Sequence, residues 1–373
     1  MTISTNAQNV MLDHSKAKVE LYKRYLSIYL NILSKADFVS KVFLYDLFAG
    51  EGKYANNELG SPIEAMNSIK NHYFANGKKI KDIKFHINDS GISKIEPGKK
   101  KIDRIGELIS EIFTPPNVKV VLTSLEYSDI YPEVEKEVRS LKAHEKALVF
   151  IDPFGYKEIK PIELRSLFLS KSVEILLFLP ISFMHRFSEK ALNDEDYTEG
   201  KALELFLRDL FMNKPPQITS AHKYIFDLKC QFQNFLGSKY VDSFSIQRDK
   251  SNIFSLFFFT HNKLGFQKMI EAKWSVDNER GKGFRLSNDL PLFSEVEIDD
   301  YETKLKNFIF ESDGKTNEEI RDYGYENSFL PKHSNQILKK LENEIEIVSI
   351  DGKDIKGTYL TNKSRQVLIK RKI

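Results

Sequence analysis

The stretch YDLFAGEGKY, residues 45–54, decides how this chain is interpreted. It continues the apolar run VFLYDLF (42–48) and then places two glycines one residue apart. Glycine lets a backbone approach a ligand closely because it has no Cβ, and the N–H groups of such a turn attract anions. The stretch therefore predicts a buried strand followed by a cofactor-binding loop, and a purely structural tight turn is the alternative.

Strand and helix patterns alternate along the chain and predict the fold class. A helical pattern at 16–33 comes first, and apolar runs typical of buried parallel strands then end near residues 48, 89, 124, 152 and 180, with helical patterns between them. This alternation indicates βαβ units with right-handed crossovers. We therefore expect an α/β fold, with a doubly wound, mostly parallel Rossmann-like sheet.

A second, smaller domain is expected at the C-terminal end. Residues 302–373 show three helical patterns and then two β-type runs, at 346–350 and 357–362. This is the order of a winged helix, whose helix pair has helix-turn-helix spacing. A polar, acidic linker, 291–301, would join it to a domain formed by residues 1–290. Such a unit binds nucleic acid or a protein partner, and the sequence leaves both open.

Polar residues follow two further predicted strands. Asn88 and Asp89 end the second run, where a carboxylate commonly holds ribose hydroxyls; a solvated turn is the alternative. Asp152, Pro153 and Phe154 follow the fourth run. There the carboxylate and the proline carbonyl can accept hydrogen bonds from an amino group while the ring stacks on a planar base. Capping of the next element is the other interpretation.

The glycine loop fits a nicotinamide dinucleotide poorly. The third glycine of that fingerprint is replaced by Ala55, and a loop of about ten residues runs to Gly60 before a helix begins. Ser61 and Glu64 form a capping-box pattern at that helix start, with Pro62 at the first helical position. The spacing favours a different nucleotide-like ligand.

Composition excludes several classes of protein. The 56 Lys+Arg residues against 53 Asp+Glu give a net charge of +3, too even to require nucleic acid as partner. The single cysteine, Cys230, excludes an internal disulfide framework, and the histidines lack paired spacing, so no metal site is expected. The longest apolar run, 175–181, is far shorter than a membrane span of about 20 residues. Without a signal-peptide pattern, we expect a cytoplasmic protein with no membrane contact.

Basic and aromatic residues near these motifs are candidates for contact with a nucleic-acid substrate. A charged helix face is usually only solvated, which is the alternative for each of them. The candidates are Lys16, Lys18, Tyr25, Lys53, Tyr54, Lys339 and Lys340.

Five motifs in order carry a family resemblance: KVELYKRYLSIYLNIL (18–33), YDLFAGEGKY (45–54), GSPIEAM (60–66), FIDPFG (150–155) and FFFTHNKLGFQKMIEAKW (257–274). Together they resemble the three-Cys-motif partner protein (TcmP) family, within the S-adenosylmethionine (SAM)-dependent methyltransferase-like fold. The resemblance implies a bacterial protein, with a partner encoded nearby that carries three cysteines and is similar to radical-SAM proteins.

A wider likeness to nucleic-acid adenine-N6 methyltransferases implies SAM as cofactor and assigns roles to residues. Asp152, Pro153 and Phe154 would bind and orient the acceptor amino group. Phe154 stands one place earlier than the aromatic ring of those enzymes, and Ser124 stands where an acid often holds the adenine of the cofactor. The implied cofactor contacts are Asp46, Phe48, Ala49, Gly50, Gly52, Asn88, Asp89 and Ser124.

Two functions from different classes follow. The first is a SAM-dependent methyltransferase acting on an amino nitrogen of a nucleic-acid base, similar to adenine N6. The second is a non-catalytic accessory or regulatory module that binds nucleic acid or the three-cysteine partner, and the shifted ring and Ser124 favour it. An oxidoreductase using a nicotinamide cofactor is a third, opposed by Ala55.

Overall fold

A computed structural model gives the fold of the chain. It describes residues 10–76, 81–153, 155–212, 220–249, 252–277, 283–285, 296–350, 355, 357–361 and 365–372. The chain divides into two compact units. The larger unit comprises Met1–Ala272 and Gly283–Leu290, and the smaller one comprises Lys273–Lys282 and Pro291–Ile373.

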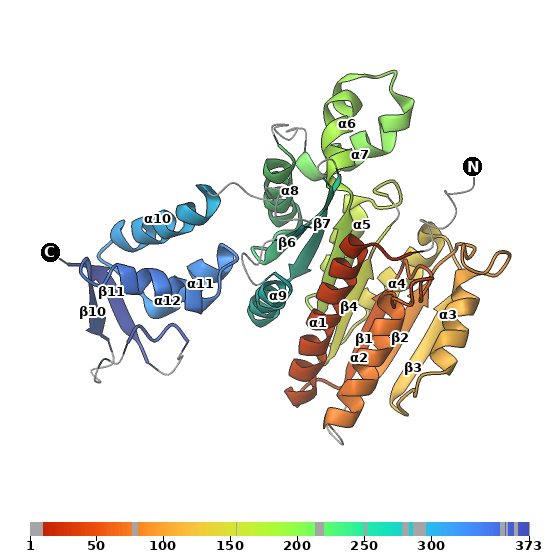
Figure 1. Cartoon of the computed structure of the whole chain (residues 1–373), viewed down its shortest axis with the longest axis horizontal. Helices are drawn as coiled ribbons and strands as arrows, with labels where there is room; N and C mark the ends of the chain where they lie inside the picture. The colour runs from red at the N-terminus through yellow and green to blue at the C-terminus, as the bar shows by residue number, and fades with distance from the viewer. Residues whose placement is uncertain are drawn as a thin grey trace. The chain divides into compact units, whose positions relative to one another are not determined.

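The larger unit is built on one sheet. Within the described residues this sheet has eight strands in the order β3-β2-β1-β4-β5-β7-β6-β8 (Figure 1). The first five strands of the chain are parallel, β7 runs antiparallel to both β5 and β6, and β8 is parallel to β6. The strands are β1 (Lys41–Asp46), β2 (Asp82–Asn88), β3 (Val118–Thr123), β4 (Glu145–Ile151), β5 (Val173–Leu179), β6 (Val241–Asp249), β7 (Asn252–Thr260) and β8 (Gly283–Arg285). The prediction of a doubly wound, mostly parallel Rossmann-like sheet is confirmed.

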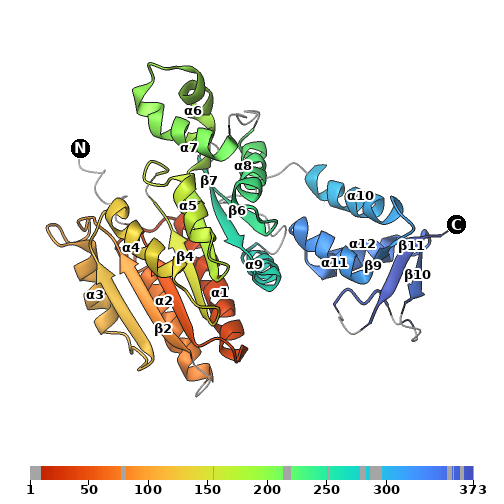
Figure 2. The same ribbon diagram turned by 180° about the vertical axis from the view of Figure 1, so that it is seen from behind.

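Helices cover both faces of this sheet. On one face α1 packs against α2 and α2 against α3, and Figure 1 is viewed from the side of α1 and α2. On the other face α5 contacts α4, α7 and α8, which come forward in Figure 2. The helices are α1 (Asp13–Lys35), α2 (Ser61–Asn76), α3 (Lys101–Ser110), α4 (Tyr127–Arg139), α5 (Pro161–Phe168), α6 (Ile181–Asn193), the short η1 (Thr198–Gly200), α7 (Lys201–Phe211), α8 (Ala221–Leu236) and α9 (Lys263–Val276).

The burial of the strands explains why the sequence predicts them. All seven residues of β5 are buried, as a continuous apolar run requires when helices cover both faces of a parallel strand. The edge strand β3 has no fully buried residue. The helix α1 packs onto the sheet through Tyr22, whose ring stacks on Phe150 of β4 with centroids 4.5 Å apart. This contact places α1 above the central strands.

The smaller unit has the winged-helix order. It contains α10 (Val296–Phe310), β9 (Lys315–Thr316), α11 (Asn317–Glu326), α12 (Pro331–Lys340), β10 (Ile345–Ser349) and β11 (Val367–Arg371). In the described part of this unit the three strands pair as β10-β11-β9. Thr316 and Glu319 form a capping box that starts α11. The second strand of the ribbon differs from the prediction: it is β11, and the described residues 357–361 form no strand.

No helix in the described ranges is long and apolar enough to cross a membrane.

Candidate functional site

The site lies where the order of the sheet reverses. From the adjacent central strands β1 and β4 the chain continues outward in opposite directions, to β2 on one side and to β5 on the other. Ligands of such folds bind outside the carboxyl ends of the strands at this switch point. Asp46 ends β1, and Asp152 follows β4. The two strand ends are joined by a hydrogen bond in which Leu47 N donates to Phe150 O at 3.2 Å. The structure thus brings both predicted acids to one sheet edge.

The glycine loop after β1 has the backbone that only glycine adopts easily. Gly50 and Gly52 have φ angles of 68° and 71°. A Cβ on Gly52 would lie 2.9 Å from Ile105 Cγ1, and Gly60 N donates to Gly52 O at 2.6 Å. Ala49 is buried beside them. The loop is therefore a tightly packed turn against α3.

The aromatic residue of the loop faces the other side of the sheet. The ring of Phe48 stacks on Tyr127 of α4 with centroids 5.3 Å apart. Phe48 packs against the core formed with α4, α5, α7 and α8. Its described contacts are with the protein interior, and they anchor the loop.

The carboxylate of Asp46 is held by the Ser61 hydroxyl and contacted by the backbone N–H of Phe48, and one of its oxygens has no hydrogen-bond partner of normal geometry. Its Oδ2 accepts a 2.6 Å hydrogen bond from Ser61 Oγ, whereas its buried Oδ1 has no hydrogen-bond partner of normal geometry. Burial raises the pKa of this carboxyl to about 7; the Ser61 hydroxyl opposes the rise, and the negative charges of Asp152 and Asp89 add to it. Ser61 was expected to cap α2, but its hydroxyl is used on Asp46, and Glu64 instead pairs with Lys23 at 3.0 Å. Asp46 is left with an acceptor for a ligand donor.

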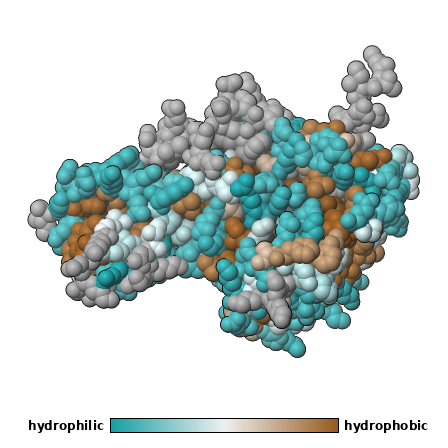
Figure 3. Space-filling model, turned by 60° about the horizontal axis from the view of Figure 1, so that its bottom comes forward, coloured by the Kyte–Doolittle hydropathy of each residue, from teal (hydrophilic) through white to brown (hydrophobic). Residues whose placement is uncertain are grey.

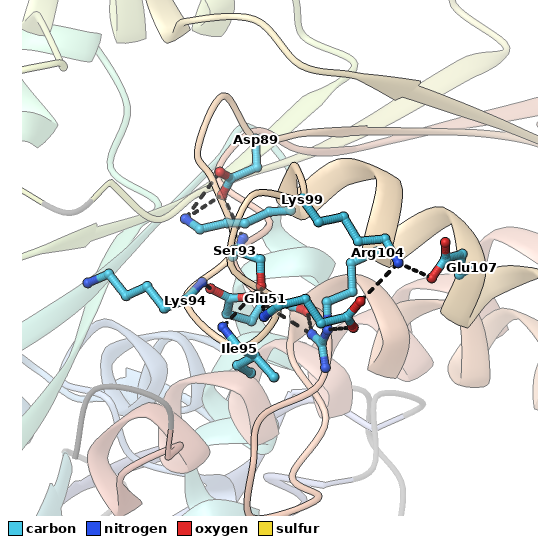
Figure 4. Close-up of polar contacts among 11 residues, drawn as sticks. Glu51, Asp89, Ser93, Lys94, Ile95, Lys99, Arg104 and Glu107 are labelled. Carbon is cyan, nitrogen blue, oxygen red and sulfur yellow. Dashed lines mark hydrogen bonds and ion pairs between the residues drawn. The ribbon is translucent and has the colours of Figure 1, made fainter. Parts of the chain in front are cut away.

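Asp89 is held by three protein donors. Its Oδ2 accepts from Gly50 N at 2.8 Å, and its Oδ1 accepts from Gly91 N at 2.8 Å and lies 3.2 Å from Lys101 Nζ (Figure 4). Asp89 and Lys101 are both buried. The carboxylate that was expected to hold a ribose thus fixes the glycine loop and neutralises a buried lysine.

The side chain of Asn88 is hydrogen-bonded to the segment that follows β3. Its amide nitrogen donates to Leu125 O at 2.9 Å, and its amide oxygen accepts from Leu125 N at 3.0 Å and from Thr123 Oγ1 at 2.9 Å. These bonds tie the end of β3 to the end of β2. Ser124, in the tied segment, is half-buried.

Glu51, between the two glycines, points away from the sheet edge. It accepts from Ser93 Oγ at 2.7 Å and from Lys94 N at 2.8 Å, and Arg104 Nη1 donates to its backbone carbonyl (Figure 4). Arg104 Nε also bonds Glu96 at 2.8 Å. These contacts fasten the loop of residues 91–100 onto the glycine loop.

Asp152 is paired with a lysine of α1. Lys18 Nζ forms an ion pair with Asp152 Oδ2 and lies 4.3 Å from the centroid of the Phe178 ring. The side chains of Lys18 and Asp152 are 12% and 16% exposed. Pro153 is buried, and Phe154 lies outside the described residues. A predicted substrate residue and a predicted catalytic residue thus contact each other directly.

The other predicted substrate residues of the larger unit lie in different surroundings. Tyr54 and Lys53 are on the glycine loop, and burial together with the charge of Asp152 raises the pKa of the Tyr54 phenol. Lys16 forms an exposed ion pair with Glu58 at 2.9 Å. Tyr25 is buried in the core and is not brought to the site.

Tyr25 belongs to a separate buried cluster. Its hydroxyl donates to Glu174 Oε2 at 2.5 Å, and Thr260 Oγ1 donates to Glu174 Oε1 at 2.8 Å. Glu174 is the second residue of β5, so this cluster lies toward the amino end of the strand. Burial raises the pKa of Glu174 to about 7, while both hydroxyls oppose the rise.

Lys339 and Lys340 end α12 in the smaller unit, and both are exposed. Lys340 Nζ lies 2.5 Å from Glu302 Oε2 of α10. Lys339 lines a cavity of about 810 Å³, together with Asn335, Ile345 and Thr358.

Three charged residues of the site went unrecognised as partners in the sequence: Glu51, Lys101 and Arg104. Lys101 and Arg104 lie in a strongly basic tract, yet both side chains are buried on the inner face of α3. Their spacing of three residues beside Ile102 and Ile105 was the available signal, since it places them on the apolar face of the helix. Among the described residues, no group of three acidic, histidine or cysteine side chains is arranged to hold a metal.

Comparisons with known proteins add distant structural likenesses. Protein LPL1258 from Legionella pneumophila str. Philadelphia 1, assigned to family model DUF519, is 10% identical with a TM-score of 0.40, covering 71% of this chain and 92% of its own. The O-methyltransferase TomG from Streptomyces achromogenes, in complex with SAM, is 10% identical with a TM-score of 0.32, covering 70% and 91%. A loganic acid methyltransferase with SAH is 9% identical with a TM-score of 0.26, covering 69% and 96%.

The sequence comparisons identify a domain in the C-terminal part of the chain. No curated protein sequence matches the chain significantly. The family model described as the GMT-like wHTH domain matches residues 273–352, in the part of the chain that forms the winged-helix unit.

Proposed function

We propose that this protein is a SAM-dependent methyltransferase that modifies an amino nitrogen of a nucleic-acid base, similar to adenine N6. One observation carries the proposal: the buried Oδ1 of Asp46, beside the glycine loop, and the carboxylate of Asp152 lie at the ends of adjacent strands on either side of the switch point. An acceptor for a cofactor ammonium and an acceptor for a substrate amino group are thus available side by side.

The residues around the glycine loop suit SAM at its methionine end. Asp46 Oδ1 is buried and has no hydrogen-bond partner of normal geometry, although the Phe48 backbone N–H contacts the carboxylate, so an ammonium group bound there would complete its hydrogen bonding. The positive φ angles of Gly50 and Gly52 favour glycine, and because glycine has no side chain, a ligand can approach the backbone of the turn closely. At the ribose end the fit is different, because Asp89 already has Lys101 and two backbone N–H groups as partners. We assign Asp89 to holding the loop that cradles the cofactor.

Asp152 would orient the acceptor. Bound SAM supplies an activated methyl group, and alignment of the acceptor nitrogen with that group provides most of the rate enhancement. The Asp152 carboxylate accepts a hydrogen bond from the amino group and stabilises the positive charge that develops on its nitrogen. A base in a duplex would have to be flipped out of the stack to reach this edge.

The winged-helix unit would hold the nucleic acid or a partner protein. Lys339 and Lys340 are exposed at the end of α12, the second helix of the helix-turn-helix pair, where phosphate contacts are chemically favoured. The three-cysteine partner implied by the TcmP resemblance is part of this proposal as the alternative ligand of the unit.

A second candidate function is a non-catalytic accessory module with the same fold. Two ion pairs favour it: Lys18 with Asp152, and Lys101 with Asp89. In each pair the lysine neutralises a carboxylate that a catalytic enzyme would use to bind the cofactor or the substrate. Such a module would bind nucleic acid or its partner without turnover.

The experiment that separates the two functions is transfer of tritiated methyl from SAM to total cell DNA, RNA and protein, with and without the neighbouring partner. The proposed function predicts labelled nucleic acid that is lost in Asp152→Ala, while SAM affinity stays within about threefold of wild type because Asp152 faces the acceptor. Nucleic-acid binding with no labelled product in any fraction would support the accessory module instead.

A further inference from the structure

We propose that Lys18 occupies the acceptor position of this site, so that a substrate amino group must take its place on Asp152. The inference rests on the proposed function and deepens it. It makes α1 part of the acceptor site, with Lys18 as a gate that must leave Asp152 before a substrate amino group can bind there. The contact is between residues 134 positions apart in the chain.

The surroundings of the Lys18 amine are those that an amino acceptor needs. Its Nζ is ion-paired with Asp152 Oδ2 and lies 4.3 Å from the centroid of the Phe178 ring. A carboxylate that accepts N–H hydrogen bonds and an aromatic face beside the nitrogen are the two groups by which a buried amine is bound. Lys18 therefore satisfies Asp152 in the way in which a substrate amino group would.

Two other lysines of α1 form ion pairs in different surroundings. Lys16 pairs with Glu58 at 2.9 Å and Lys23 pairs with Glu64 at 3.0 Å, with 38% and 40% of their side chains exposed. The Lys18 side chain is only 12% exposed. A long charged side chain normally keeps its head in water, so the inward position of Lys18 is specified by its partners.

Packing on both sides of Lys18 holds it in place. One turn later on α1, Tyr22 stacks on Phe150 of β4. Four residues before it, His14 stacks on Phe254, which stacks in turn on Phe178 with centroids 5.3 Å apart. The ring below the amine and the helix above it are therefore both fixed by aromatic contacts.

The charges near Asp152 explain why exchange is required. Asp46 and Tyr54 both have raised pKa values to which the negative charge of Asp152 contributes. If Lys18 left without a replacement, Asp152 would stand largely buried, unpaired and close to another acid, which is costly. An incoming amino group supplies N–H donors to Asp152 as Lys18 leaves. The gate thus favours acceptors that carry an amino group over those that lack one.

The test removes the positive charge of Lys18 and keeps the packing of its side chain on Phe178. Lys18→Met retains an unbranched side chain above Phe178, and Lys23→Met, which removes an exposed lysine of the same helix, is the matched control. Each protein, saturated with S-adenosylhomocysteine, is titrated with a fluorescent single-stranded oligoadenylate and with the same oligomer built from purine riboside, which lacks the 6-amino group. We expect Lys18→Met to bind oligoadenylate about fivefold tighter than wild type, with Lys23→Met unchanged and little gain for the purine riboside oligomer.

A second readout follows the exchange in the wild-type protein. Lysine acylation mapped by mass spectrometry should label Lys18 more slowly than Lys16, and oligoadenylate should raise labelling of Lys18 about threefold without raising that of Lys16. This measurement needs neither SAM nor turnover, and it decides the matter if Lys18→Met folds poorly.

Three results would overturn the inference. Oligoadenylate binding that Lys18→Met does not improve, including no binding by any variant, overturns the inference, as does an equal gain for both oligomers. In the wild-type protein, labelling of Lys18 that oligoadenylate leaves unchanged overturns it as well. Failure of the proposed function is seen separately, as the absence of heat when SAM is titrated into the wild-type chain.

Discussion

Ser61 Oγ donates a 2.6 Å hydrogen bond to Asp46 Oδ2 and thereby joins the first residue of α2 to the last residue of β1. The bond fixes the carboxylate so that one oxygen is held by the protein. The other oxygen, Oδ1, stays buried without a partner of normal geometry, and the pKa of the group is raised to about 7, chiefly by burial. The charge of Asp46, the acid that we propose binds the cofactor ammonium, therefore depends on pH near neutrality.

This relationship predicts a pH dependence of cofactor affinity. An ammonium group binds the ionised form of Asp46, and that form is lost as pH falls through the raised pKa of about 7. SAM affinity should therefore weaken about fivefold to tenfold between pH 7.5 and pH 6, because the ionised fraction falls by that factor. Isothermal titration calorimetry at both pH values measures the change.

The control for this dependence is Asp46→Asn, which keeps an oxygen acceptor for Ser61 but cannot ionise. It should bind SAM weakly at both pH values, with no difference between them. A variant that retains the wild-type pH profile would show that another group titrates.

Glu174 predicts a pH dependence of stability. Its pKa rises from 4.5 in the unfolded chain to about 7 in the fold, so the folded state binds the proton more tightly between these values. The free energy of unfolding should therefore fall as pH rises from about 4.5 to about 7, by about 3 kcal/mol from this group. Urea denaturation of wild type and Glu174→Gln across this range tests the sign, because the variant should lose that part of the slope. Glu189→Gln, an exposed change in α6, should keep it.

Gly52 and Gly98 form a matched pair for testing the glycine loop. Both have positive φ angles, 71° and 88°, so alanine at either costs roughly 1 kcal/mol of backbone strain. At Gly52 the new Cβ would also meet Ile105 Cγ1 at 2.9 Å, whereas at Gly98 nothing lies within 4 Å. Gly52→Ala should destabilise the protein by about 1–3 kcal/mol more than Gly98→Ala, measured by denaturant unfolding. Equal losses would contradict the packing against α3.

The capping box of α11 can be tested with the chain's own tryptophan. Trp274, the only tryptophan, is buried in the smaller unit and donates a 2.9 Å hydrogen bond to Ser328 O, so its fluorescence reports on that unit. Thr316→Ala removes the hydroxyl that accepts from Glu319 N at 3.2 Å and should destabilise the unit by about 1 kcal/mol. Glu318→Gln, beside the cap, should leave the fluorescence midpoint nearly unchanged. A Thr316→Ala midpoint equal to wild type would contradict the role of the cap.

The larger part of the fold was predictable because buried parallel strands are short apolar runs with clear ends. The strand β6 was not predicted, since several of its buried residues are polar, among them Asp242, Ser245 and Gln247. The helices α6 and α8 were also missed. Position along the sheet edge was predictable for Asp46 and Asp152, because parallel strands end at the same edge.

The pairing of the site residues was not predictable, because the partners are far apart in sequence. Lys101 meets Asp89 and Lys18 meets Asp152 only after the sheet has formed. A lysine in a charged tract normally stays in water, and although the spacing around Lys101 indicates a buried helix face, no local pattern indicates which carboxylate either lysine meets. The contacts of Asp89 were unpredictable for the same reason, since its partners come from three different segments.

Calorimetric titration of SAM into the full chain tests the central claim most directly. The proposed function predicts one saturable site per chain, a stabilising thermal shift, and loss of both in Asp46→Asn. Absence of heat together with an unchanged melting temperature would contradict SAM binding and, with it, the assignment of this sheet edge as a methyl-transfer site.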